Sequence, residues 1–103
     1  RGLRPVARNY RCRGGEIDLI MLDSQCLVFV EVRCRASNAF VTPSHTVDRR
    51  KQRKIIRTAA IFLSRQRQFA NANVRFDVVA IEGRSADDVR WIRDAFRPDD
   101  AGF

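Results

Sequence analysis

Two strand-like segments joined by a short polar turn constrain the fold of this chain more than any other feature. Glu16–Met21 and Leu27–Arg33 are rich in aliphatic and β-branched residues, and Asp23–Gln25 supplies turn-forming residues between them. Alternate residues of a strand share a face. One face of this hairpin is therefore expected to carry Glu16, Asp18, Ile20, Phe29, Glu31 and Arg33.

The length of the turn decides which side chains of the hairpin face each other. With a loop of two or four residues, Asp18 lies opposite Glu31 and Glu16 lies opposite Arg33, whereas a three-residue loop puts Asp18 opposite Val30. Two opposed, partly buried carboxylates repel each other unless a cation lies between them. Because their ligand atoms are all oxygen, Mg²⁺ or Mn²⁺ is favoured over zinc. A solvated face on which Arg33 neutralises the acids is the alternative.

The rest of the pattern predicts a mixed α/β fold with the element order β-β-β-α-β-β. Its expected elements are strands at Val6–Tyr10, Glu16–Met21 and Leu27–Arg33, a loop at 36–45, a helix from Thr46 or Asp48 to about Gln68, and strands at Val74–Ile81 and Val89–Ile92. With 103 residues the chain is expected to form a single domain, residues 1–103. One helix leaves one sheet face poorly covered, so we expect a preceding helix that this sequence lacks, or one from another chain.

Basic residues are concentrated at the start of the predicted helix. The chain carries 20 Lys and Arg against 12 Asp and Glu, a net charge of +8. Positive charge near a helix N-terminus opposes the helix dipole, so local stability does not account for it. We expect these residues to contact phosphates, although a basic surface kept for solubility is the alternative. The predicted nucleic-acid-binding residues are Arg49, Arg50, Lys51, Arg53, Lys54 and Arg57.

Several classes of protein are disfavoured by what the sequence lacks. No apolar segment approaches the roughly 20 residues that a membrane span needs, and the first residues lack the apolar core of a signal peptide. Cys12, Cys26 and Cys34 have no zinc-site spacing and are expected to be buried or half-buried thiols in a reducing compartment. We therefore expect a cytoplasmic protein with no membrane partner, and we leave homodimerisation open.

Several stretches of the chain carry a resemblance to a known family. These stretches are Ala7–Ile20, Leu27–Arg33, Lys51–Lys54, Arg75–Ala80 and Trp91–Phe96. Together they resemble the YraN-like family of small bacterial proteins, which is largely uncharacterised. The resemblance covers nearly the whole chain.

That family in turn resembles the PD-(D/E)xK nuclease superfamily, which includes restriction endonucleases and Holliday junction resolvases. Its motif is an Asp followed by Glu-x-Lys on the next strand, and Asp18, Glu31 and Arg33 stand at these positions. The resemblance implies a restriction endonuclease-like fold and a site in which Asp18, Glu31 and the Val32 carbonyl hold Mg²⁺ or Mn²⁺. Arg33 would stabilise the developing charge and orient the nucleophile.

Accessory groups and departures from the motif bear on the activity that the resemblance implies. By the same resemblance, Lys51 or Gln52 would lie near the metal, and Glu16 is a further acid on the hairpin. Arg33 stands where lysine is usual, and an arginine cannot serve as a base near neutral pH. The family's usual N-terminal helix, with its own glutamate, is absent from this sequence.

Three functions therefore compete. The first is a metal-dependent endonuclease-like protein acting on DNA, with branched or junction DNA as candidate substrates. The second is a nucleic-acid-binding protein that keeps the fold without catalysis, with DNA favoured over RNA as the partner. The third is a structural or partner-binding protein whose hairpin acids pair with arginines.

Overall fold

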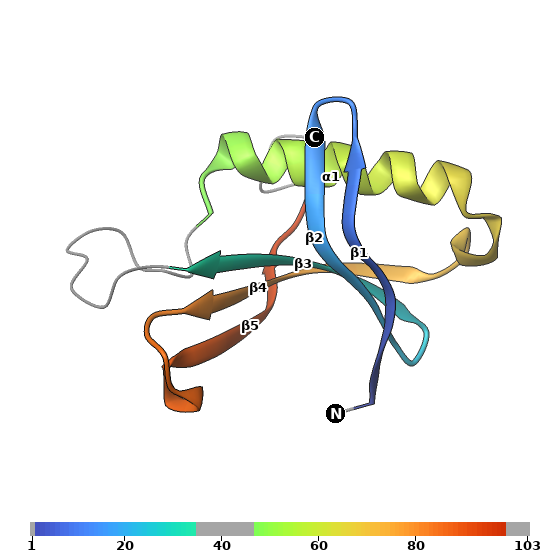
Figure 1. Cartoon of the computed structure of the whole chain (residues 1–103). Coiled ribbons are helices and arrows are strands. Elements are labelled where there is room, and N and C mark those ends of the chain that lie inside the picture. Colours follow the sequence, from blue (N-terminus) through green and yellow to red (C-terminus); the bar gives the residue numbers. More distant parts are fainter. Residues whose placement is uncertain (1, 35–46, 99–103) are drawn as a thin grey trace.

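One mixed sheet packed against a single long helix makes up the computed structural model, which describes residues 2–34 and 47–98 (Figure 1). Its elements are β1 (Leu3–Cys12), β2 (Gly15–Asp23), β3 (Cys26–Cys34), α1 (Arg49–Arg65), η1 (Arg67–Phe69), β4 (Asn73–Ile81), η2 (Ala86–Asp88) and β5 (Val89–Phe96). The strand order is β1-β2-β3-β4-β5, and only β3 and β4 are parallel. A parallel pair needs a crossover connection, and α1 lies in that connection. The predicted α/β class and element order are confirmed, and the arrangement is consistent with a restriction endonuclease-like fold.

The helix is shorter than the sequence pattern predicts. Its N-cap is Asp48, one of the two predicted caps, which accepts a hydrogen bond from the Lys51 amide at 2.9 Å. The other, Thr46, and the predicted loop lie outside the described residues. At the other end α1 stops at Arg65, because Gln66 leaves the helical region, and a 3₁₀ turn follows in place of the predicted last residues. No helix in the described ranges is long and apolar enough to cross a membrane.

Aromatic rings fix α1 on the sheet. Phe62 of the helix meets Phe29 of β3 edge-on with 6.0 Å between ring centroids, and Phe29 stacks on Phe76 of β4 at 5.5 Å. Phe76 in turn stacks on Phe96 of β5 at 5.2 Å. Phe62 is one of the buried residues of the helix, with Ile55, Thr58 and Ala59. The rings connect the helix through three consecutive strands, so they set where it lies on the sheet.

The sheet face away from α1 is not bare at its centre. Val28 and Val30 are fully buried there and pack with Val79, beside Trp91 and other partly buried side chains. The expectation that one helix would leave this face poorly covered is therefore wrong for its centre. The physical reason is that β3 and β4 carry apolar side chains on both faces. Those on the face away from α1 pack against one another.

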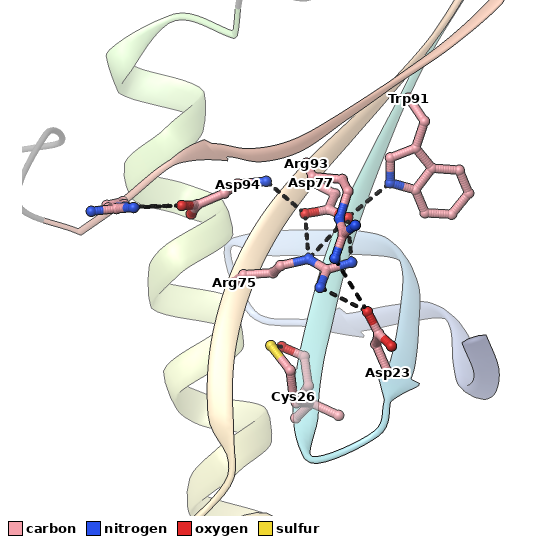
Figure 2. Close-up of polar contacts among 9 residues, drawn as sticks. Asp23, Cys26, Arg75, Asp77, Trp91, Arg93 and Asp94 are labelled. Atoms are coloured by element: carbon pink, nitrogen blue, oxygen red, sulfur yellow. Dashed lines mark hydrogen bonds and ion pairs between the residues drawn. The ribbon is translucent and has the colours of Figure 1, made fainter. Parts of the chain in front are cut away.

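A buried charge network also lies on this face (Figure 2). The Asp77 carboxylate is 0% exposed and accepts hydrogen bonds from the Arg75 Nε at 3.0 Å, the Trp91 indole at 2.8 Å and the Asp94 amide at 2.9 Å. Arg75 also bonds Asp23 at 2.9 Å. Asp94 has φ 52° and lies where the β4–β5 register shifts. The network therefore gives the Asp94 amide a hydrogen-bond acceptor at the point where the backbone of β5 is irregular. It also joins β2, β4 and β5.

The β2–β3 hairpin has the register that the sequence predicts. Asp23 pairs with Cys26 around a two-residue loop, in which Ser24 has a left-handed φ of 58°. The ladder continues in this register and its last pair joins Leu19 to Val30. The even-numbered loop, on which the proximity of the two acidic residues depends, is confirmed.

Beyond that last pair β2 leaves β3 and continues with β1 across α1 (Figure 1). The expected pairs of Asp18 with Glu31 and of Glu16 with Arg33 are therefore not formed as ladder pairs. Strict alternation also fails in this part of β2, because Ile17 and Ile20 both pack in the core on the helix side. Alternate residues lie on the same face only while a strand stays regular. This part of β2 is not regular, because it follows β1 away from β3.

Candidate functional site

A recess of about 260 Å³ lies where β2 leaves β3, beside the first turns of α1. It is lined by Gly15, Glu16, Asp18, Glu31, Val32, Lys51, Lys54 and Ile55. The lining contains the three residues predicted as metal ligands and two of the three predicted accessory residues. Residues distant in the sequence thus meet at one place, because the crossover brings the start of α1 back to the end of the hairpin.

Asp18 occupies the gap that β2 leaves beside β3. Its Oδ2 accepts a hydrogen bond from the Val32 amide at 2.8 Å, where a backbone carbonyl would have continued the ladder. The N–H and C=O groups of one strand residue point to the same neighbouring strand. The Val32 carbonyl is therefore expected to face the same gap, with an oxygen directed to the recess that holds the Asp18 carboxylate.

Glu31 is a buried acid bonded to a helix lysine. Its side chain is 6% exposed, and its Oε2 lies 2.6 Å from the Lys51 Nζ, whose side chain is 53% exposed. Burial raises the pKa of Glu31 above its ordinary value and the negative charge of Asp18 raises it further, while the hydrogen bond from Lys51 lowers it. Asp18 and Glu31 are thus neighbouring acids in the recess, and Lys51 supplies the cation that pairs with Glu31 in this structure.

The remaining predicted residues lie at the edges of the recess or outside its lining. Arg33 is half-buried on β3, level with Ala80 of β4, and does not line the recess. Gln52 turns back to the start of the helix, where its amide donates to the Val47 carbonyl at 2.6 Å. Glu16 lines the recess, and its carboxylate is 3.5 Å from Arg11 in an exposed pair.

The sequence therefore grouped the acids correctly and missed their partner. The alternative of a solvated face took Arg33 as the cation that neutralises Glu31 or Glu16, whereas in the described residues Glu31 pairs with Lys51 and Glu16 with Arg11. Lys51 was predicted as an accessory group near the metal and as a phosphate-contacting residue, but not as the partner of Glu31. The signal that could have pointed to it is its position as the third residue of a basic helix start, the turn whose side chains lie nearest the preceding strand end.

The six predicted phosphate-contacting residues are all exposed on α1. They form the basic helix face, which comprises Arg49, Arg50, Lys51, Arg53, Lys54 and Arg57. Lys51 and Lys54 also line the recess, so this face continues to the two acids. Such an arrangement surrounds an acidic centre with positive charge that a polyanion can contact.

The donor set of the recess fits a hard divalent cation in part. Two carboxylates and a carbonyl are oxygen ligands of the kind that Mg²⁺ accepts together with several waters. In the described part of the chain, no three His, Cys, Asp or Glu side chains are grouped so as to hold a metal ion. A divalent ion here would therefore depend on Asp18, Glu31, the Val32 carbonyl and water, and it would compete with Lys51 for Glu31.

The thiols do not contribute to this site. Cys12 and Cys26 are half-buried and Cys34 is exposed, and all three are free. The prediction of buried or half-buried thiols is therefore wrong for Cys34, which is the last residue of β3.

Comparison with known proteins identifies the family. Residues 1–81 match the uncharacterised protein family UPF0102, the YraN-like family. A UPF0102 protein of Saccharophagus degradans is 53% identical over 95 residues, which cover 92% of this chain and 78% of that protein. Others from Stutzerimonas stutzeri and Xylella fastidiosa are 49% and 48% identical, over 92% and 96% of this chain and 80% and 81% of their own lengths. The chain thus belongs to the UPF0102 family.

Proposed function

We propose that this protein is a metal-dependent endonuclease-like protein acting on DNA, with branched and junction structures as the first substrates to test. The observation that carries the proposal is the convergence of Asp18, Glu31 and Val32 on one recess beside Lys51. These are an Asp, a Glu on the next strand and a lysine, the residue types of the nuclease motif that the sequence resembles.

In this proposal Lys51 takes the part that the motif gives to lysine. Its ammonium is bonded to Glu31 and remains half exposed, so it can contact both the buried acid and a phosphate at the mouth of the recess. Arg33 then acts from the edge of the site, as a fixed positive charge on β3.

The two acids and the Val32 carbonyl would hold the ion. Mg²⁺ or Mn²⁺ bound there would polarise the scissile phosphate and make a bound water more acidic. The protein's own contribution is positional: the Val32 amide holds Asp18 in one orientation, and burial holds Glu31 in another. Lys54 and its neighbours on the basic helix face would contact flanking phosphates.

A second function is favoured by one specific observation. Lys51 already balances the charge of Glu31, and the described residues include no three-ligand metal cluster. A Glu31 carboxylate that is already paired with a lysine supports a nucleic-acid-binding protein that does not cleave. In that case the acids would orient Lys51 and limit where the polyanion sits.

Cleavage and binding should be measured on the same variants. Duplex, single-stranded and four-way junction DNA are incubated with the protein and Mg²⁺ or Mn²⁺, beside Asp18→Asn, Glu31→Gln and the control Asp87→Asn, whose exposed carboxylate lies outside the recess. The nuclease proposal expects metal-dependent cleavage that both recess variants lose and the control retains. DNA binding without cleavage by any of the four proteins would leave the second function. Neither binding nor cleavage by the unmodified protein would reject both.

A further inference from the structure

The β1–β2 hairpin extends beyond the rest of the sheet. Pairing between β1 and β2 continues to Cys12 and Gly15, whereas β2 pairs with β3 only as far as Leu19. The end of the hairpin therefore stands away from β3, crosses α1 and projects past it (Figure 1). We name this projecting end, residues 11–16, the hairpin arm.

The hairpin arm is basic at its tip. Arg11 and Arg13 are both exposed, and the Arg11 side chain is 75% exposed despite its 3.5 Å contact with Glu16. An ion pair so open to water contributes little to stability, so folding does not require this arginine. Between the strands, Gly14 has φ +93°, a conformation that side-chain-bearing residues rarely adopt. The tight turn presents two guanidinium groups on either side of Cys12.

The hairpin arm is also held rigidly on the helix. Gly15 lies so close to Thr58 that any side chain at this position would collide with the threonine hydroxyl. The Cys12 thiol contacts the same hydroxyl at 3.7 Å, and Tyr10 meets Phe62 edge-on with 5.1 Å between ring centroids. A binding element that is ordered before contact loses less entropy when it binds. The backbone that carries the two arginines is thus packed against the helix.

The recess lies between the hairpin arm and the basic helix face. Gly15 and Glu16 at the base of the arm line one side of it, and Lys51 and Lys54 of α1 line the other. Lys51 and Lys54 border the acidic centre on the helix side, whereas Arg11 and Arg13 lie further out on the other side, at the tip of the arm whose base carries Glu16. A linear polyanion can contact both groups of cations at once only by lying across the recess, with successive phosphates on each side.

We infer that the hairpin arm is a second phosphate-binding element, which holds the sugar-phosphate backbone of DNA across the recess. The inference rests on the proposed function in taking nucleic acid as the partner. It adds residues that the basic helix face does not include, and it gives the bound strand a path, from the helix start to the hairpin tip. A two-stranded β-ribbon is also of a size that the major groove of duplex DNA admits.

The test compares two charge-matched double variants of the whole protein. Arg11→Gln/Arg13→Gln removes the arginines of the arm, and Arg84→Gln/Arg90→Gln removes two exposed arginines outside the arm and the recess. Affinity for fluorescent duplex and junction DNA is measured by anisotropy over a range of salt concentrations. The slope of log affinity against log salt falls by about one for each phosphate that the protein no longer neutralises. We expect this slope to fall by nearly two in the arm variant, with affinity about tenfold or more weaker, and to change much less in the control variant.

Each outcome bears on a different proposal. Equal reductions in the two double variants would overturn the inference and leave the proposed function intact, because binding would then reflect net charge alone. Absence of DNA binding by the unmodified protein would instead reject the proposed function. Vesicles rich in phosphatidylserine form a parallel measurement, and a reduction confined to vesicle binding would overturn the choice of DNA.

Melting temperatures control for the fold. Unchanged values would show that the exposed substitutions leave the structure intact. If one double variant melts lower, the corresponding single substitutions replace it. Unchanged DNA affinity in both Arg11→Gln and Arg13→Gln would then overturn the inference.

Discussion

Replacing Lys51 by methionine isolates the electrostatics of the recess. Methionine keeps most of the apolar stem of lysine and removes the ammonium that lies 2.6 Å from the Glu31 carboxylate. Glu31 then remains buried at 5% exposure, with Asp18 as its charged neighbour and without the lysine that balances its charge. We expect a lower free energy of unfolding near neutral pH.

The magnitude follows from the exposure of the two partners. Fully exposed ion pairs contribute less than about 1 kcal/mol, whereas breaking a buried pair costs about 3–5 kcal/mol. Glu31 is buried and Lys51 is about half exposed, so we expect the free energy of unfolding to fall by about 1–3 kcal/mol. Removing a positive charge from the first helix turn returns a few tenths of a kcal/mol.

This destabilisation should depend on pH in a defined direction. The pKa of Glu31 in the folded protein lies above its ordinary value of 4.5 because of burial, and removing the Lys51 hydrogen bond raises it further. A folded acid with a raised pKa binds its proton more tightly than the unfolded chain does. The contribution of Glu31 to the free energy of unfolding is therefore greatest below its ordinary pKa, and it falls as pH rises through the raised pKa of the folded protein. The cost of Lys51→Met should therefore be smaller at about pH 4, below the ordinary pKa of Glu31, than at about pH 8.

Urea denaturation of a double-mutant cycle measures this effect. The cycle comprises the unmodified protein, Lys51→Met, Glu31→Gln and the double variant, each at the two pH values, with Lys54→Met as the matched control on the same helix face. In the Glu31→Gln background, the substitution of Lys51 should cost almost nothing. A cost that is the same at both pH values, or one that persists without the Glu31 charge, would refute the reasoning.

Three further substitutions test the fold that supports the site. Asp77→Asn removes the fully buried charge opposite Arg75 and should cost about 3–5 kcal/mol in urea denaturation; a cost below about 1 kcal/mol would show that the network is not a determinant of stability. Phe62→Ala removes the helix ring that meets Phe29 and should cost about 3–5 kcal/mol by thermal or chemical denaturation, and a cost like that of an exposed substitution would contradict the ring packing described. Asp48→Ala removes the helix N-cap and should cost about 1 kcal/mol, with Asp48→Asn retaining most of the stability if the cap is the cause.

The element order and the hairpin register could be predicted because both depend on local information. The strand segments show apolar and β-branched patterns, and a two-residue turn sets which residues pair across the hairpin. The Asp48 cap is likewise set by neighbours along the chain. These interactions span only a few residues, so the amino-acid pattern was sufficient to predict them.

Other features depended on contacts between distant segments, which the pattern along the chain does not encode. Phe62 belongs to the core because Phe29 and Tyr10 are there to meet it. Asp77 lies among apolar residues of β4, and it accepts hydrogen bonds from donors that only the folded sheet brings together. Whether a buried acid is satisfied depends on the positions of donors elsewhere in the chain.

The β2–β3 hairpin shows which features of the site the sequence determined and which depended on the tertiary structure. Its sequence alone predicted that Asp18 and Glu31 share a face if the turn holds an even number of residues, and the two-residue turn meets that condition. Only the tertiary structure decided that β2 leaves β3 at this point, that Asp18 takes the Val32 amide, and that Lys51 reaches Glu31. The reason is that the position of the first turn of α1 beside β3 depends on how α1 packs on the sheet, through contacts such as that of Phe62 with Phe29.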